Sequence, residues 1–325
     1  MSEKNIDWYV YEGNGKTTLE SIKEKKPKWR NKKLPKHNAQ TFIANEKIKE
    51  AVNTAIYLRR PLLVTGDPGI GKSTLAKAIA ENLNLGEVLK WQITSRSVLK
   101  DALYSYDALA RLHNIQMLKL LDEQGCSLEE NKNLSVEIKN YLKLGVLGTA
   151  FLSKTKRVVL IDELDKSDRD LPNDLLHVFE EQEFEIAELK RLQYDKPITI
   201  EDSEGNPCPI TNGEVEVQED FPIIIMTSNG EQDFPPAFLR RCICVEFALP
   251  DDPDEQIVQL VEMVKAHFKE HKDSDKIETI VEEFVELKED GLRSNDQLLN
   301  AMFLVLEQEN ISFDDFKDTV LQAIG

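Results

Sequence analysis

The chain has 325 residues, and its 41 Lys and Arg residues against 59 Asp and Glu residues give a net charge of −18. At about 150 residues per domain, this length suggests two domains with a sizeable core. The apolar stretches are far shorter than the ~20 residues of a membrane span, the four cysteines are too few for a disulfide framework, and the start, MSEKNIDWYV, has no signal-peptide layout. The sequence therefore predicts a cytoplasmic protein without a membrane span.

Charge is distributed unevenly along the chain. Residues 1–40 hold ten basic and five acidic residues, whereas residues 250–325 hold seven and twenty. We interpret residues 1–40 as a basic extended arm, because prolines lie among its charges and its apolar periodicity is weak. A net charge of −18 repels phosphate backbones, so we do not expect nucleic acid as a partner. The arm keeps a nucleic-acid contact open as an alternative.

Strands and helices alternate beyond the arm. Strands are predicted at 61–65, Val88–Thr94, Arg157–Asp162, 221–228 and 242–248, and helices at Glu46–Leu58, Ser73–Asn82 and Leu171–Glu181. This alternation predicts an α/β fold with a doubly wound, parallel, five-stranded sheet. After Pro250 the strands stop and acidic helices follow. We therefore predict an α/β core at residues 41–248 and an all-helical lid at residues 249–325.

Two insertions interrupt this alternation. Residues 97–144 are predicted to be mainly helical, with a break near Gln124–Cys126. Residues 183–221 alternate between polar and apolar side chains, and turn signals occur at Glu204–Gly205 and Asn212–Gly213. That pattern predicts a β-hairpin insertion.

The sequence GDPGIGKS at residues 66–73 fits the phosphate-loop motif G-x-x-x-x-G-K-[ST], and it lies between a predicted strand and a predicted helix. The candidate nucleotide-binding residues are Gly66, Asp67, Pro68, Gly69, Ile70, Gly71, Lys72, Ser73 and Thr74. Glycines let successive N–H groups point at phosphate oxygens, and the helix adds its positive dipole end. We expect Lys72 to reach the β- and γ-phosphates and the Ser73 hydroxyl to bind Mg²⁺.

Polar residues follow two further predicted strands. Asp162 and Glu163 emerge at the carboxyl end of the strand at 157–162, where ligands bind in open α/β sheets. We expect Asp162 to hold the Mg²⁺ shell and Glu163 to act as the general base on the attacking water. Asn229 follows the strand at 221–228 and is expected to orient that water. A simple turn is the alternative for Asn229.

These motifs, together with PPAFLRRC at residues 235–242, resemble the AAA+ ATPase plan over about residues 41–325. Within it the chain most resembles the MoxR-like branch, because of the long helical insertion, the sequence DLLHVFEEQEFEI at 174–186 and the hairpin before Asn229. The sequence TSNGEQDFPPAFLRRC is similar to members encoded beside von Willebrand factor A domain proteins in bacterial conflict systems.

The resemblance implies a ring, commonly hexameric, with ATP held between neighbouring subunits. Arg241, with Arg240 as second choice, then matches the arginine finger that reaches a neighbour's γ-phosphate. The alternative is that both arginines pair with acidic surface groups. In the lid, the position that aligns with the family's phosphate-contacting arginine is Asp296, and Arg293 is the candidate substitute.

The implied function is a Mg²⁺-dependent ATPase that couples hydrolysis to remodelling or gating a partner protein. A protein with a von Willebrand factor A domain is the candidate partner. Two alternatives stay open: an AAA+ motor or loader that acts on nucleic acid, and an ATP-sensing scaffold with slow turnover.

Overall fold

A computed structural model describes residues 27, 41–123, 137–192, 196–218, 220–271, 275–288, 294–307 and 312–321. The chain divides into two compact units. One contains residues 47–64 and 83–245, and the other combines residues up to Glu46 with residues 65–82 and 246–325. Apart from Pro27, the predicted arm lies outside the described residues. The predicted boundaries at residues 40 and 248 stay predictions.

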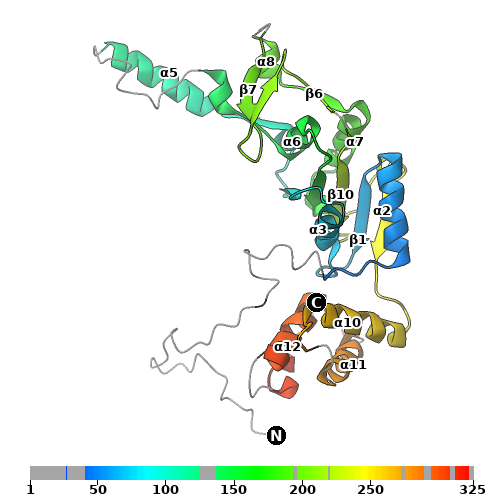
Figure 1. Cartoon of the computed structure of the whole chain (residues 1–325). Helices are drawn as coiled ribbons and strands as arrows, with labels where there is room; N and C mark the ends of the chain where they lie inside the picture. Colours follow the sequence, from blue (N-terminus) through cyan, green and yellow to red (C-terminus); the bar gives the residue numbers. More distant parts are fainter. Residues whose placement is uncertain are drawn as a thin grey trace, which may run out of the picture. The chain divides into compact units, whose positions relative to one another are not determined.

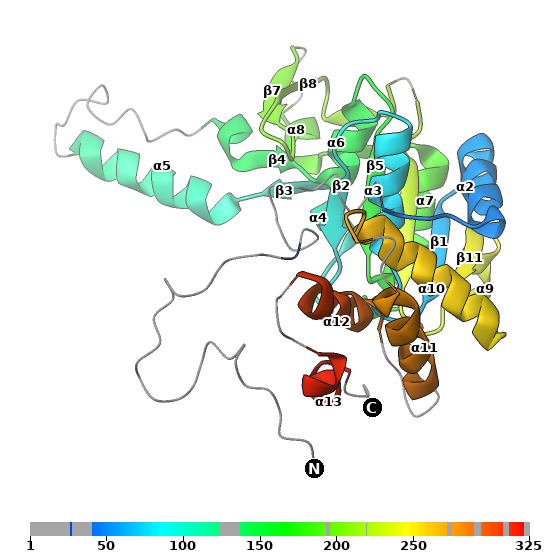
Figure 2. The ribbon, with the colours of Figure 1, turned by 60° about the horizontal axis from the view of Figure 1, so that its bottom comes forward.

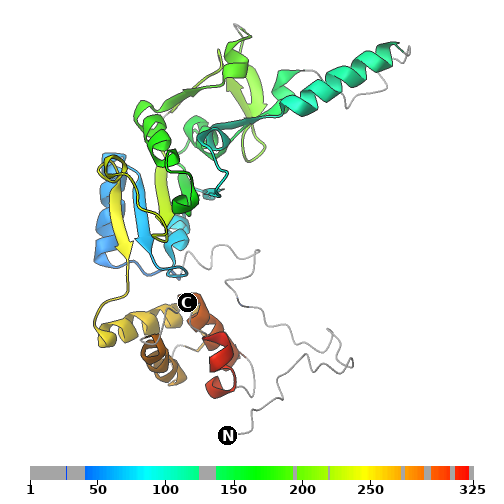
Figure 3. The same cartoon turned by 180° about the vertical axis from the view of Figure 1, so that it is seen from behind.

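The first unit is built on a five-stranded parallel sheet, as predicted, with the strand order β11-β1-β10-β5-β2 (β10 is labelled in Figure 1, the other four strands in Figure 2). Its strands are β1 (Leu62–Gly66), β2 (Leu89–Gln92), β5 (Val158–Asp162), β10 (Ile223–Ser228) and β11 (Ile243–Phe247). The sheet order places β11, drawn in yellow in Figure 3, at one edge. Strands β5 and β10 are buried along their whole length, which is typical of strands inside a parallel sheet.

Strand register brings polar residues to the same end of this sheet. Residues Ile223 to Met226 of β10 pair with Val158 to Ile161 of β5. On the other side of β5, Gln92 of β2 pairs with Asp162. The parallel pairing therefore places Gln92, the last residue of β2, directly beside Asp162, the last residue of β5.

Helices and phenylalanine rings complete the core of this unit. The helices include α2 (Glu46–Leu58), α6 (Val146–Leu152), α7 (Leu171–Glu181) and α9 (Pro236–Leu239). The Phe151 ring lies 6.2 Å from that of Phe184 and 6.4 Å from that of Phe221. Phe151 is fully buried, and burying such a side chain contributes about 1.5–3 kcal/mol.

The prediction of a mainly helical segment at 97–144 is partly wrong. Helices α4 (Leu99–Leu103) and α5 (Ala108–Glu123) and the 3₁₀ turn η4 (Ile138–Tyr141) are present, and Figure 1 shows α5 as one long helix. Two short strands, β3 (Tyr104–Tyr106) after α4 and β4 (Leu142–Leu144) after η4, pair antiparallel. The predicted break near Gln124–Cys126 lies outside the described residues. Three-residue strands are too short to show the period of two by which strands are predicted.

The hairpin prediction for 183–221 is also partly wrong. Strands β7 (Ile198–Glu201) and β8 (Pro207–Ile210) form a hairpin around the predicted Glu204–Gly205 turn, and they join β3 and β4 in a four-stranded sheet. The other two strands, β6 (Glu183–Glu185) and β9 (Glu214–Glu216), pair separately, with the short helix α8 (Ala187–Lys190) after β6. Asn212 and Gly213 have the positive φ angles that a tight turn needs, and this turn leads into β9.

The second unit contains α3 (Lys72–Asn82) and the helical C-terminal region, which confirms the predicted helices. The region comprises α10 (Pro253–His267), α11 (Lys276–Lys288), α12 (Asn295–Glu307), the 3₁₀ turn η6 (Phe313–Asp315) and α13 (Lys317–Val320), and Figure 2 shows α10, α11 and α12 together. They share a separate core that includes Val264, Phe284 and Met302. Asp252 caps α10, since its side chain accepts hydrogen bonds from the amides of Asp254 and Glu255.

Within the described part of the chain, no helix combines the length and the apolar character that crossing a membrane requires.

Candidate functional site

The loop between β1 and α3 depends on glycines for its backbone path. Gly66, Gly69 and Gly71 have φ angles of +140°, +77° and +104°, and L residues with side chains rarely adopt such angles. A Cβ atom on Gly66 would also lie 2.2 Å from the carbonyl oxygen of Phe247. Position 66 therefore requires glycine both for its conformation and for its close contact with the neighbouring backbone.

Lys72 begins α3 and points back into this loop. The residue is only 7% exposed, and its ammonium donates hydrogen bonds to the carbonyl oxygens of Gly66 at 2.5 Å and Asp67 at 2.8 Å. Asp67, Pro68 and Gly69 are exposed, while Ile70, Ser73 and Thr74 are half-buried. A buried ammonium above a curled, glycine-rich backbone is a site that suits an anion with several oxygens, such as a polyphosphate.

Residues from the helical C-terminal region and from the chain before α2 approach the same loop. A Cβ atom on Gly69 would lie 2.8 Å from the Cβ of Ser294, the residue before α12. Phe42 lies near Gly71, and its ring stacks on that of Phe247 with 6.1 Å between centroids.

The structure describes only one of the two C-terminal residues that the sequence singled out, Arg293 and Asp296. Arg293 lies outside the described residues. Asp296, in the first turn of α12, accepts a hydrogen bond from the Asn300 side chain at 2.9 Å.

Asp162, the last residue of β5, is held on both carboxylate oxygens. It is 6% exposed; its Oδ1 accepts a hydrogen bond from the Thr227 hydroxyl at 2.7 Å, and its Oδ2 lies 2.6 Å from the Lys90 ammonium. A buried carboxylate beside a cation at the end of a parallel strand fits the oxygen ligands that Mg²⁺ prefers. The Asp162 carboxylate is thus chemically suited to the predicted metal-binding role.

Glu163 follows Asp162 in a left-handed backbone conformation, with φ +62°. A residue with a side chain is strained there, and the strain is offset by neighbouring contacts. Its amide donates a hydrogen bond to the Thr227 hydroxyl at 2.9 Å. Its Oε2 accepts hydrogen bonds from the Gln92 side chain and from the Lys166 ammonium, both at 2.8 Å. The hydrogen bond with Glu163 raises the pKa of Lys166, so this lysine stays charged beside the carboxylate.

Sequence reasoning assigned no role to Lys90, Gln92 or Thr227. Lys90 and Gln92 lie in β2, with Gln92 as its last residue, and Thr227 is a polar residue near the end of β10. Polar residues at the ends of neighbouring strands are a usable signal, but their partners follow only from the register between β2, β5 and β10.

Asn229 lies in the turn after β10, and its backbone is held by the segment that follows β5. Its amide donates a hydrogen bond to the Asp165 carboxylate at 2.8 Å, and the Glu231 amide donates to the same oxygen at 3.1 Å. Gly230 has φ +78°, and its amide donates to the Ser228 hydroxyl. The turn that the sequence indicated for residues 228–230 is therefore present, with Asn229 in it.

Arg240 and Arg241 follow α9 and are exposed. The Arg241 side chain pairs with Glu180 of α7 at 2.7 Å, and both side chains are about half exposed. The carbonyl oxygen of Arg240 accepts a hydrogen bond from Arg60. Within one chain, Arg241 thus pairs with an acidic surface residue, the alternative that the sequence left open.

Residues 60–286 match the family model described as AAA domain (Cdc48 subfamily). The chain belongs to this family. AAA domains in general bind nucleotide and hydrolyse ATP, which agrees with the AAA+ resemblance. The finer MoxR-like assignment stays a prediction.

Among solved structures, NtrX from Brucella abortus in complex with ADP is similar at 16% identity with a TM-score of 0.37. The match covers 77% of this chain, and the chain spans about half of NtrX, 52%. A search of curated proteins found no match.

Proposed function

We propose that this AAA domain protein is a Mg²⁺-dependent ATPase that assembles into a ring and uses hydrolysis to remodel or gate a partner protein. The observation that carries the proposal is the loop at residues 66–73, in which three glycines curl the backbone around the buried Lys72 ammonium. Loop amides and Lys72 bind the phosphates of ATP. Ser73 and Asp162 hold Mg²⁺, which when bound neutralises phosphate charge.

Glu163 and Asn229 act in hydrolysis. The Glu163 carboxylate accepts the proton of the attacking water, and the hydrogen bonds from Gln92 and Lys166 orient that carboxylate. The neutral amide of Asn229 orients the water without changing the charge of the site.

Arg241, with Arg240 as second choice, serves the pocket of a neighbouring subunit. The Glu180 pair of Arg241 is a half-exposed surface pair, and such pairs contribute little free energy. Arg241 therefore loses little free energy when it leaves Glu180 to contact a neighbour's γ-phosphate. The partner with a von Willebrand factor A domain, the setting in a bacterial conflict system and the cytoplasmic location rest on the sequence resemblance.

A mixing experiment tests both hydrolysis and ring assembly. We expect Glu163→Gln and Arg241→Ala each to lower ATP turnover about 100-fold or more while ATP binding stays near the wild-type value. Mixed in equal amounts, the two variants should recover roughly a quarter of the wild-type turnover, because that share of pockets joins an intact Glu163 to an intact Arg241 in trans. Steady-state hydrolysis and equilibrium binding of ATP measure these effects.

Two controls make the outcome interpretable. Arg191→Ala removes an exposed arginine elsewhere on the surface and should leave turnover unchanged, and Lys72→Ala should lose ATP binding itself. Absence of recovery in mixed rings of normal size would refute the trans arginine. Equal and low turnover in wild type and Glu163→Gln would instead favour the ATP-sensing scaffold.

A further inference from the structure

Asp165 lies on the 3₁₀ turn η5 (Leu164–Lys166) that follows β5. The residue is 4% exposed, and its Oδ2 accepts two backbone hydrogen bonds, from Asn229 at 2.8 Å and from Glu231 at 3.1 Å. Two amides of the turn after β10 thus converge on one carboxylate oxygen.

Two further hydrogen bonds connect the same two segments, here with the side chain on β10. Thr227, in β10, holds the end of β5, because its hydroxyl contacts both Asp162 and the Glu163 amide. Asp165, beyond β5, holds the turn after β10. Together these contacts fix the positions of Glu163 and Asn229 relative to each other, independently of either side chain's own hydrogen bonds.

Asp165 destabilises the folded state in one respect, which a purely structural role does not explain. Its Oδ1 is buried without a hydrogen-bond partner among the described residues, and a buried carboxylate with an unused oxygen destabilises the folded state. Hydrogen bonds from amides to a charged acceptor are, in return, short and strong. The unpaired oxygen and the two strong amide bonds together indicate that Asp165 serves to hold the turn after β10 in one conformation.

We propose that Asp165 is a positioning residue for hydrolysis: it holds the turn that carries Asn229 and so places the Asn229 side chain at the attacking water. The proposal rests on the ATPase function proposed above. In this role Asp165 contacts neither the nucleotide nor the attacking water. Its effect on the reaction passes entirely through Asn229.

A double-mutant cycle on the full chain tests the proposal. A displacement of about 1 Å costs about 100-fold in rate, so we expect Asp165→Ala to lower kcat by about that factor while the ATP dissociation constant stays within about threefold. Asn229→Ala should show a similar loss. The double variant should be no slower than Asn229→Ala alone, because the two residues act as one unit.

The conservative variant and amide exchange separate positioning from general support. Asp165→Asn keeps an oxygen that accepts both amides and should retain kcat within about fivefold. Hydrogen exchange at the Asn229 and Glu231 amides should accelerate about tenfold or more in Asp165→Ala and stay near wild type in Asp165→Asn.

Three results would overturn the positioning role. They are additive losses in the double variant, wild-type kcat in Asp165→Ala, and unchanged exchange at both amides. A wild-type protein that binds ATP and never hydrolyses it would overturn the proposed function, and the positioning role would fall with it. Activity in the wild type therefore distinguishes failure of the function from failure of this inference.

Discussion

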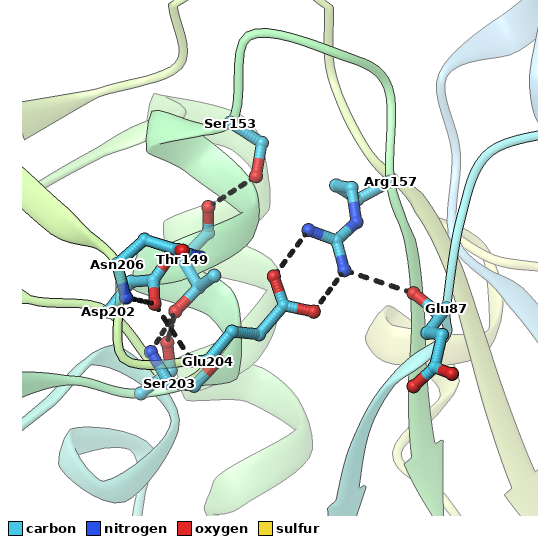
Figure 4. Close-up of polar contacts among 9 residues, drawn as sticks. Glu87, Thr149, Ser153, Arg157, Asp202, Ser203, Glu204 and Asn206 are labelled. Atoms are coloured by element: carbon cyan, nitrogen blue, oxygen red, sulfur yellow. Dashed lines mark hydrogen bonds and ion pairs between the residues drawn. The ribbon is translucent and has the colours of Figure 1, made fainter.

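The two ends of β5 are connected to the rest of the first unit in different ways. At the carboxyl end, Asp162 and Glu163 are held by Lys90 and Gln92 of β2 and by Thr227 of β10. At the amino end, Arg157, which precedes β5, makes two hydrogen bonds to the Glu204 carboxylate at 2.8 and 2.9 Å and one to the Glu87 carbonyl oxygen at 3.0 Å (Figure 4).

Polar groups at the amino end are arranged to support one another. Glu204 lies in the turn between β7 and β8, and Asp202 accepts the amides of Glu204 and Asn206 across that turn. The Ser203 amide donates to the Thr149 hydroxyl (Figure 4). These contacts attach the inserted hairpin to the sheet. The carboxyl end instead concentrates acidic groups where the strand stops, as a site for a cation and a reactive water requires.

Removing a contact at the carboxyl end of β5 should give the largest effect of the three, on both turnover and stability. Thr227→Val keeps the shape of the side chain and removes the hydroxyl that contacts Asp162 and the Glu163 amide. We expect kcat to fall about 10- to 100-fold. The free energy of unfolding should fall by about 1–3 kcal/mol, because the buried Asp162 carboxylate and the Glu163 amide each lose a partner. Turnover assays and urea unfolding measure the two effects.

Thr227→Ser is the matched control, since it retains the hydroxyl and removes only a methyl group. It should keep most of the turnover. If Thr227→Val hydrolyses ATP at the wild-type rate, the hydroxyl does not position Glu163.

The difference between the two ends also decides what the sequence could predict. The loop at 66–73 and the pair Asp162 and Glu163 are encoded by local motifs, so their positions at strand ends were predicted. Lys90, Gln92 and Thr227 contact that pair from other strands, and such contacts follow only from strand order and register.

The insertions show the same limit. β3 and β4 are three residues long, and β9 pairs with β6, about thirty residues earlier in the chain. Local patterning predicted the β7–β8 turn correctly. It could not predict that four short strands from two insertions form one sheet.

Removing the Arg157–Glu204 contact at the amino end of β5 should lower stability and leave kcat unchanged. Arg157→Ala leaves Glu204 without its cation. Since the Glu204 side chain is 37% exposed, we expect a loss of only about 1–2 kcal/mol in the free energy of unfolding. The kcat per folded molecule should not change. Arg157→Lys keeps the charge but not the bidentate hydrogen bonding, so its loss of unfolding free energy should be intermediate.

This effect should depend on pH. The hydrogen bond from Arg157 holds the pKa of Glu204 below its ordinary value of 4.5. The stabilisation is therefore complete above pH 4.5 and is lost as the pH falls through the lowered pKa of the folded state. Unfolding of wild type and Arg157→Ala, compared from pH 7 to pH 3, should show two curves that converge in acid. A constant gap would show that Arg157 stabilises the protein by packing instead.

The smallest effect is expected in the β6–β9 pair, where like charges face each other instead of being paired. Glu183 lies opposite Glu216, and Glu185 lies opposite Glu214. Lys190 contacts both Glu185 and Glu214 of the second pair, whereas no cation within the described part of the chain contacts the first pair. Glu216→Lys replaces a repulsive cross-strand pair with an attractive one, so we expect a gain of about 0.5 kcal/mol that shrinks as salt screens the charges. Glu214→Lys is the matched control, since the same charge change on the same strand sets a second cation beside Lys190. It should give no gain, and equal gains from both variants would assign the effect to net charge instead of to strand register.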